Sequence, residues 1–336
     1  MSGSTPTINR IGIVGAGAWG TALASIAARA GRDVTLWAYE PEVADTINSA
    51  HENRLYLPGI NLDPGIRATT DHTVVAKCEA ILLVCPAQTM RSVTSTLAQD
   101  VTAGTPLAIC AKGIEQSTGK LMTQVVEETV PHAIPSVLSG PSFAADVAQD
   151  LPTAVTLACE DDDVGQALID AIGILTFRPY LASDLIGAEI GGSVKNVLAI
   201  ACGIVEGKKL GASAAAALTA RGFAELTRLG VALGARAETL SGLSGLGDLI
   251  LTCGSRQSRN MSLGAALGEG RKLEDVLGER VSVAEGVATA PAVVDLARSH
   301  GVEMPICEAV ASVVTGASSV DEAITALLSR PFRRES

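Results

Sequence analysis

Ile11-Gly12-Ile13-Val14 runs directly into Gly15-Ala16-Gly17-Ala18-Trp19-Gly20, and helix-forming residues follow over Thr21–Ala30. The first four residues are typical of a buried strand, because they are apolar and mostly β-branched. The three glycines allow backbone N–H groups to approach a pyrophosphate at the start of the helix. A glycine turn that only packs a helix on a sheet would not explain three glycines at this spacing. We therefore expect a dinucleotide to bind at this turn.

Short β-branched runs alternate with helical stretches from Ile8 to about Tyr180. This rhythm predicts a largely parallel, doubly wound sheet of the Rossmann type. After about Ser183 only Ala- and Leu-rich helical periodicity continues. We therefore expect an α/β fold, with a dinucleotide-binding domain over residues 1–185 and an all-α domain over residues 186–336. The predicted strands are Ile11–Val14, Val34–Trp37, Ala80–Cys85, Pro106–Cys110, Ser136–Ser139 and Thr153–Ala158.

The composition excludes several classes of protein. A formal net charge of −11 argues against binding to nucleic acid or to anionic membranes, because both depend on basic surfaces. Met1–Thr7 lacks the pattern of a signal peptide, and no later segment has about 18 uninterrupted apolar residues. We expect a cytoplasmic protein without stable membrane insertion. The seven cysteines lie far apart, so reduced and mostly buried thiols are expected.

The sequence offers no metal site that we would predict. The histidines His51, His72, His132 and His300 are scattered, without the spacing of metal ligands. Asp161-Asp162-Asp163 reads better as the acidic N-terminus of a helix than as a metal site. Ser319 and Glu322 predict a capping box for a last helix over residues 320–329.

Several short motifs occur in the order found in one known family, and they span nearly the whole chain. They are Gly15-Ala16-Gly17-Ala18-Trp19-Gly20, Tyr56-Leu57-Pro58-Gly59, Ala111-Lys112-Gly113-Ile114-Glu115, Gly140-Pro141-Ser142-Phe143-Ala144, Val194-Lys195-Asn196, Gly245-Leu246-Gly247-Asp248-Leu249, Ser258-Arg259-Asn260 and Val283-Ala284-Glu285-Gly286. Through them the chain resembles the bacterial NAD(P)-dependent glycerol-3-phosphate dehydrogenases. The resemblance implies interconversion of sn-glycerol 3-phosphate and dihydroxyacetone phosphate, which would supply glycerophospholipid synthesis.

The resemblance also implies roles for individual residues, with Lys195 as the acid–base group and residues 186–336 as the helical substrate and catalytic domain. The catalytic set would be Lys195, Lys112, Asp248, Asn196 and Thr252. The substrate would contact Lys112, Gly140, Ser142, Lys195, Asp248, Ser258, Arg259 and Asn260. The cofactor would contact Gly15, Gly17, Ala18, Trp19, Gly20, Tyr39, Tyr56, Lys112, Ala144, Arg259, Val283 and Glu285.

The chemistry supports a lysine in this role. Oxidation of a secondary alcohol needs a base for the hydroxyl proton while hydride leaves for the nicotinamide. Lys195 can serve if burial and a positive neighbour lower its pKa toward the working pH. Lys112 is the expected neighbour, and Asp248 is expected to orient the ammonium group and to moderate the shift.

A stripe of small residues surrounds this lysine if residues 190–202 are helical. The residues that would share one face are Gly191, Gly192, Lys195, Ala199 and Cys202. We interpret the stripe as a face cleared for substrate or nicotinamide. Close helix packing, with the lysine reaching out to solvent, is the alternative, and this stretch alone does not decide between them.

Arg256, Ser258, Arg259 and Asn260 precede a helical pattern that starts near Met261. Donors at a helix start suit a phosphate group. The alternative is a solvated loop with surface arginines, but in an acidic chain that binds two anionic ligands we favour the phosphate site.

The choice between NAD and NADP depends on the segment after the second strand, Trp37-Ala38-Tyr39-Glu40, where the adenosine ribose is expected. Many relatives have a basic residue there, whereas Glu40 would repel a 2′-phosphate. Glu40 could instead accept a hydrogen bond from the 2′-hydroxyl of NAD or point into solvent before Pro41, and Arg32 or Arg54 could compensate its charge. We expect NADH to be used at least as well as NADPH.

Two other functions stay open. One is a related dehydrogenase, with a Rossmann and a helical domain, that acts on a hydroxy acid or a sugar phosphate. The other is a non-catalytic dinucleotide-sensing module, against which both lysines and Asp248 argue. The Ala-rich helical region is compatible with a homodimer.

Overall fold

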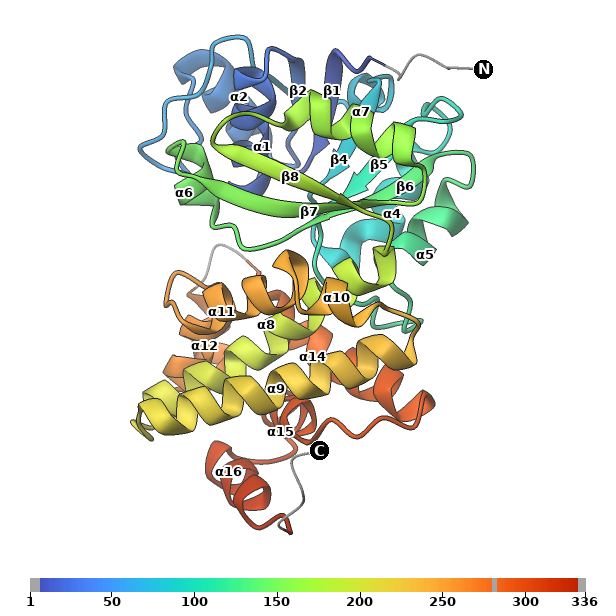
Figure 1. The fold of residues 1–336 in the computed structure, drawn as a ribbon. Coiled ribbons are helices and arrows are strands. Elements are labelled where there is room, and N and C mark those ends of the chain that lie inside the picture. Colours follow the sequence, from blue (N-terminus) through green and yellow to red (C-terminus); the bar gives the residue numbers. More distant parts are fainter. Residues whose placement is uncertain (1–6, 280–282, 332–336) are drawn as a thin grey trace.

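The computed structural model describes residues 7–279 and 283–331. Its N-terminal part is built on one eight-stranded sheet with the order β3-β2-β1-β4-β5-β6-β7-β8 (Figure 1). Strands β1 to β6 are parallel, whereas β7 runs antiparallel to β6 and carries β8 in the same direction as itself. The strands are β1 Arg10–Val14, β2 Asp33–Trp37, β3 Arg67–Thr69, β4 Ala80–Leu83, β5 Pro106–Ile109, β6 Ile134–Ser139, β7 Thr153–Cys159 and β8 Phe177–Ala182.

Helices cover both faces of this sheet, as the doubly wound prediction requires. In β4 the side chains of Ala80 and Leu82 join the core on one face, and those of Ile81 and Leu83 join the core on the other. Helices α1, α2, α6 and α7 pack on the first face, and α3, α4 and α5 on the second. The elements are α1 Ala18–Arg29, α2 Pro41–Ala50, α3 His72–Ala76, the 3₁₀ helix η1 Ala87–Thr89, α4 Met90–Leu97, α5 Met122–Thr129, α6 Ala144–Ala148 and α7 Asp162–Ile172.

After Ala182 the described chain contains helices but no strand, and these helices form the lower half of Figure 1. They are α8 Leu185–Gly207, α9 Ala212–Ala232, α10 Ala237–Leu240, the π-helical turn η2 Leu243–Gly247, α11 Asp248–Cys253, α12 Arg259–Gly268, α13 Leu273–Gly278, α14 Glu285–Ser299, α15 Pro305–Val314 and α16 Val320–Leu328. The predicted fold class is confirmed.

Several local predictions are also confirmed. Ser319 and Glu322 form the capping box of α16, and Asp161 caps α7 by accepting a hydrogen bond from the Val164 amide. All seven cysteines are buried and unpaired. Two strands were missed, β3 and β8. They are the edge strands of the sheet, where exposed polar residues and a proline such as Pro179 are tolerated and the apolar pattern is weak.

Helix α8 forms the centre of the helical part. It contacts α9, α11, α12, α14 and α15, and also reaches strand β6. Among the described residues it is the one helix long and apolar enough to cross a membrane, but the apolar stretch is entirely buried inside the protein. Its composition is therefore that of a core helix.

Glycines bring α8 and α12 into backbone contact. A Cβ atom on Gly264 would lie 2.0 Å from the Ile200 carbonyl oxygen, and one on Gly203 would lie 2.1 Å from the Met261 carbonyl oxygen. Backbone atoms cannot withdraw as a side chain can. The two helices can therefore pack at this distance only without side chains there.

Gly264→Ala is expected to destabilise the protein by about 1 to 3 kcal/mol, the usual cost of overpacking a core. The midpoint of thermal unfolding should fall by several degrees. Gly278→Ala is the matched control, because Gly278 also lies in a helix but its Cβ position has no atom within 4 Å. Equal melting temperatures for the two variants would contradict this account of the packing.

Candidate active site

Gly15, Gly17 and Gly20, the three glycines between β1 and the first turn of α1, differ in what surrounds their Cβ positions. Gly15 has φ +117° and lies against the backbone of Val84 at the end of β4. A Cβ atom on Gly20 would lie 1.8 Å from the Gly15 carbonyl oxygen. At Gly17, by contrast, a Cβ atom would meet nothing within 4 Å, and α1 begins at the next residue. The backbone is thus exposed at the helix start, where a pyrophosphate would bind.

A carboxylate held between two lysines lies at the junction of the two parts of the chain. Lys195 Nζ donates to Asp248 Oδ1 at 2.6 Å, and Lys112 Nζ donates to Asp248 Oδ2 at 2.6 Å. Thr252 Oγ1 accepts from Lys195 Nζ at 2.8 Å. Lys112 follows β5, whereas Lys195 lies within α8 and Asp248 begins α11. The structure therefore brings together residues from three segments that are widely separated in the sequence.

Burial sets the protonation behaviour of this group. Lys195 is 7% exposed and Asp248 is 1% exposed. Burial lowers the pKa of Lys195 to about 8, with the Asp248 charge opposing the shift and the Lys112 charge adding to it. Burial alone would raise the pKa of Asp248, but the two lysines outweigh it and hold that pKa below its ordinary value. The arrangement agrees in sign with the expected influence of Lys112 and Asp248 on Lys195, and the catalytic roles of these residues stay a prediction.

Two asparagines connect the segments around the lysines. Asn196 Nδ2 donates to the Lys112 carbonyl oxygen at 3.2 Å, and Asn260 Nδ2 donates to Asn196 Oδ1 at 2.9 Å. Asn260 Oδ1 accepts from the Gly286 amide at 3.0 Å. The result is a chain of hydrogen bonds from the end of β5 through α8 and α12 to α14.

The segment after β6 approaches Lys112 from the other side. The Gly140 carbonyl oxygen accepts from Lys112 Nζ at 3.2 Å and from Ser142 Oγ at 3.1 Å. Gly140 has φ +156°, and a Cβ atom there would lie 2.8 Å from the Cα atom of Val155. Ser139 is buried beside this group, and its hydroxyl has no hydrogen-bond partner among the described residues. Sequence reasoning did not identify Ser139.

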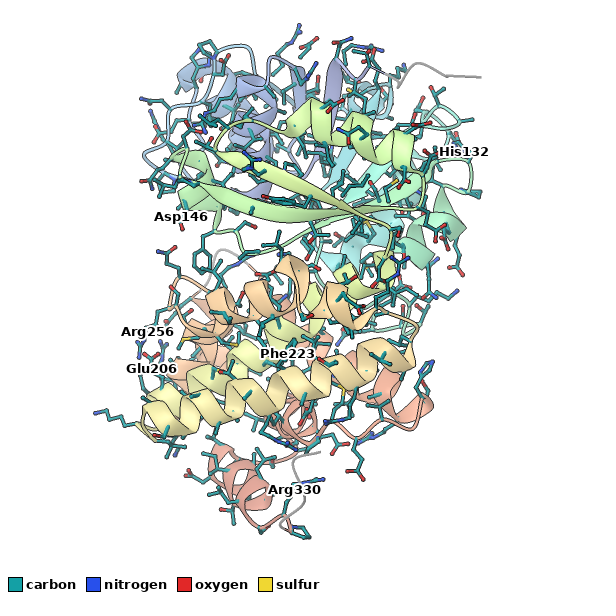
Figure 2. All side chains as sticks on the ribbon, in the orientation of Figure 1. His132, Asp146, Glu206, Phe223, Arg256 and Arg330 are labelled. Carbon is teal, nitrogen blue, oxygen red and sulfur yellow. The ribbon has the colours of Figure 1, made fainter. Side chains whose placement is uncertain are left out.

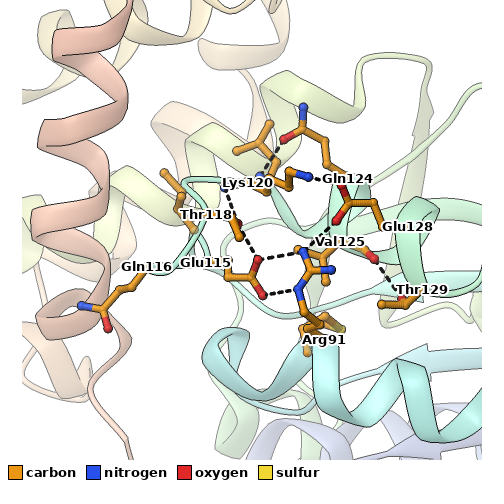
Figure 3. Close-up of polar contacts among 12 residues, drawn as sticks. Arg91, Glu115, Gln116, Thr118, Lys120, Gln124, Val125, Glu128 and Thr129 are labelled. Carbon is orange, nitrogen blue, oxygen red and sulfur yellow. Dashed lines mark hydrogen bonds and ion pairs between the residues drawn. The ribbon is translucent and has the colours of Figure 1, made fainter.

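The loop after Lys112 is fixed by a network of ion pairs (Figure 3). Glu115 is largely buried and accepts from Arg91 Nε and Nη2, both at 2.9 Å. Arg91 also donates to Glu128 of α5, which pairs with Lys120. Arg91 lies in the first turn of α4 and Glu128 lies in α5. The network therefore holds the loop after Lys112 against both helices. Arg91 was also missed, since an isolated arginine carries no sequence signal for such a contact.

The interpretation of α8 as a cleared face is wrong. A Cβ atom on Gly191 would lie 2.5 Å from the Ser244 carbonyl oxygen, and one on Gly192 would lie 2.8 Å from Ser139 Oγ. The space beside both glycines is therefore occupied by protein backbone and side chains. The alternative interpretation is close helix packing with the lysine reaching out to solvent. The helix is closely packed, but Lys195 is buried and bonded to Asp248 instead of reaching solvent.

Arg259 and Glu285 are the first residues of α12 and α14. Arg259 is exposed, yet desolvation by the surrounding protein lowers the pKa of its guanidinium group, with the Glu285 charge opposing the shift. Burial raises the pKa of Glu285, partly offset by the Ala87 amide, which donates to Glu285 Oε1 at 3.2 Å, and by Arg259. Ser258 caps α12 by accepting from the Met261 amide.

Other predicted residues lie apart from this group. Arg256 pairs with Glu206 and Glu269, and Figure 2 shows the first pair at the outer edge of the helical part. The phosphate interpretation therefore does not extend to Arg256. Tyr39 and Val283 are exposed, at 79% and 53%. Trp19 lies in the first turn of α1, and its indole N–H is buried without a hydrogen-bond partner among the described residues.

Comparison with known proteins gives the family. Residues 10–165 match the model of the NAD-dependent glycerol-3-phosphate dehydrogenase N-terminus, and residues 184–325 match that of the C-terminus. The glycerol-3-phosphate dehydrogenase [NAD(P)+] of Parvibaculum lavamentivorans is 66% identical over 98% of this chain and 99% of that protein. The enzyme of the same name from Maricaulis maris is 63% identical over 97% of this chain and 98% of that protein.

A solved structure agrees over the same length. The crystal structure of glycerol-3-phosphate dehydrogenase from Coxiella burnetii is 39% identical and superposes with a TM-score of 0.93, covering 97% of this chain and 100% of that one. The models that match the two halves of the sequence and the superposed crystal structure thus indicate the same family. The chain belongs to the NAD-dependent glycerol-3-phosphate dehydrogenase family.

Proposed function

We propose that this chain interconverts sn-glycerol 3-phosphate and dihydroxyacetone phosphate with NAD(P), and that Lys195 is its acid–base group. The observation that carries the proposal is the buried carboxylate of Asp248 between Lys195 and Lys112. One lysine would be enough to neutralise Asp248 in a purely structural ion pair. A module that only senses a dinucleotide would need neither lysine next to its dinucleotide-binding domain.

A lysine with a pKa of about 8 can hold or release a proton near neutral pH. During reduction, protonated Lys195 donates its proton to the carbonyl oxygen of dihydroxyacetone phosphate, while the nicotinamide, when bound, supplies the hydride. During oxidation, neutral Lys195 accepts the hydroxyl proton. Asp248 and Thr252 orient the Nζ atom through hydrogen bonds of 2.6 and 2.8 Å. Asn196 supports this geometry by holding the Lys112 backbone.

We assign the anionic end of the substrate to the start of α12. Ser258, Arg259 and Asn260 lie there, and the positive end of the helix dipole adds to the Arg259 charge. Asn260 is already bonded to Asn196, so it holds the site together as well as offering its remaining N–H. Gly140 and Ser142 complete the substrate site beside Lys112.

The glycine turn suits the pyrophosphate of a dinucleotide, since its open backbone lies at the start of α1. We assign residues 1–185 as the dinucleotide-binding domain and residues 186–336 as the helical substrate and catalytic domain, with residues of each domain reaching the ligand of the other. The assigned cofactor residues are Gly15, Gly17, Ala18, Trp19, Gly20, Tyr39, Tyr56, Lys112, Ala144, Arg259, Val283 and Glu285. We also propose that the enzyme is cytoplasmic and homodimeric, and that it supplies glycerol 3-phosphate for glycerophospholipid synthesis.

Lys195→Ala should lower kcat by about 100-fold or more, while the affinity for the cofactor changes little. In the wild-type enzyme, kcat/KM for reduction should fall as the pH rises through about 8, because the protonated lysine is lost. Oxidation should show the opposite trend. NADH absorbance follows both reactions.

Lys208→Ala is the control for that experiment, because Lys208 caps the end of the same helix and pairs with Asp321. Its kcat and pH profile should match the wild type. A folded Lys195→Ala enzyme with near-normal kcat would remove Lys195 from the chemistry.

Arg259→Ala should raise KM for dihydroxyacetone phosphate by roughly 10- to 150-fold, which corresponds to the loss of a charge-assisted hydrogen bond of about 1.5 to 3 kcal/mol. Arg256→Ala, three residues earlier in the chain, is the matched control, since Arg256 pairs with Glu206 and Glu269. Wild-type KM in the Arg259 variant would move the phosphate site elsewhere.

The wild-type enzyme should use NADH at least as well as NADPH. If Glu40 and a 2′-phosphate came within about 5 Å at an effective dielectric near 20, their repulsion would cost roughly 3 kcal/mol, or about 100-fold in affinity. Measurement of kcat/KM with each cofactor at saturating dihydroxyacetone phosphate tests this. A tenfold or greater preference for NADPH would overturn it.

A further inference from the structure

The carboxylate of Glu40 has a fixed orientation. Glu40 follows β2 and precedes Pro41, the first residue of α2, with an extended backbone at φ −91° and ψ 124°. Its side chain does not cap α2. Instead, Glu40 Oε1 accepts a hydrogen bond from Tyr56 Oη at 2.8 Å. The side chain is thus neither drawn to the helix start nor left without a partner in solvent.

Tyr56 is itself held in place. Its ring is half-buried against the core of the sheet domain, and its amide donates to Asn53 Oδ1 at 3.1 Å. Burial first, and then the Glu40 carboxylate, raises the pKa of the Tyr56 hydroxyl. The hydroxyl therefore remains a proton donor at neutral pH.

Asn53 connects this pair to the glycine turn. It is 1% exposed, and its Nδ2 atom donates to the Ala16 carbonyl oxygen and to Thr21 Oγ1, both at 2.8 Å. Ala16 lies within the turn itself, between the first two glycines. One buried side chain thus links the turn that would receive the pyrophosphate to the tyrosine that holds Glu40.

The two arginines that could neutralise Glu40 are bonded elsewhere. Arg32 donates to the carbonyl oxygens of Asp170 and Ala171 near the end of α7. Arg54 pairs with Glu52. In the described part of the chain neither arginine therefore pairs with Glu40, which lies shortly after β2, where the adenosine ribose of a dinucleotide is expected.

We propose that Tyr56 is a positioning residue for cofactor selection, holding the Glu40 carboxylate where it accepts a ribose 2′-hydroxyl and excludes a 2′-phosphate. The inference deepens the proposed use of NADH and rests on it. A carboxylate free to rotate would turn away from a phosphate and be screened by water. One held by Tyr56 must first lose that hydrogen bond, while its remaining lone pairs stay available to a hydroxyl donor.

The experiment compares kcat/KM for NADH and NADPH in the wild type, Tyr56→Phe, Glu40→Ala and the double variant. Tyr56→Phe removes one hydroxyl and should lower the NADH-to-NADPH selectivity about tenfold, whereas Glu40→Ala should lower it by up to about 100-fold. In the Glu40→Ala background Tyr56→Phe should have no further effect. Tyr180→Phe, on the edge strand β8, is the matched control and should leave selectivity and kcat unchanged.

The outcomes separate this inference from the proposed cofactor preference. If Tyr56→Phe leaves the selectivity unchanged while Glu40→Ala lowers it, Glu40 acts without Tyr56 and the inference is overturned. If Tyr56→Phe acts equally with and without Glu40, its effect comes from direct contact with the cofactor alone, and the positioning role is overturned. A wild-type preference for NADPH contradicts the proposed preference, but a Glu40-dependent effect of Tyr56→Phe would still support the positioning role.

Discussion

The buried carboxylate of Asp248 is the group on which the arrangement of the site depends. An almost fully buried negative charge is costly unless it is paired, and here both of its oxygens accept from lysines. The second lysine has a specific effect. When Lys195 gives up its proton, Lys112 still neutralises Asp248, so the proton can leave without creating an unpaired buried charge. Two cations on one carboxylate thus allow Lys195 to be both buried and titratable.

The same carboxylate joins the two parts of the chain. Lys112 comes from the end of a strand, whereas Lys195 and Asp248 come from the helical part. The asparagine chain from the Lys112 carbonyl oxygen to the Gly286 amide repeats this connection through neutral groups. Both the nitrogen and the oxygen of each asparagine side chain are hydrogen-bonded. The segments that carry Lys112 and Lys195 are therefore held in place before any ligand binds.

Sequence reasoning succeeded where a residue's role is local or carried by an ordered motif. The alternation of β-branched runs and helical stretches predicts the doubly wound sheet, and the lysine motifs lead to residues that do meet in space. It failed where the deciding partner is distant. The glycines of α8 looked like open space, and only the position of Ser244 shows that backbone fills it. Asn53 gave no signal of its own, although it lies three residues before the Tyr56 motif.

Helix α8 has one more consequence, which follows from where it carries Lys195. The lysine lies near the middle of a helix whose neighbours pack against it on every side, with glycines letting α12 touch its backbone. The Lys195 nitrogen, which we propose as the acid–base group, is not borne by a flap or a surface loop. Heat or denaturant therefore cannot displace this nitrogen by local fraying, as it could a group on a mobile segment. The nitrogen that we propose as the acid–base group is therefore lost only when the hydrophobic core around α8 unfolds.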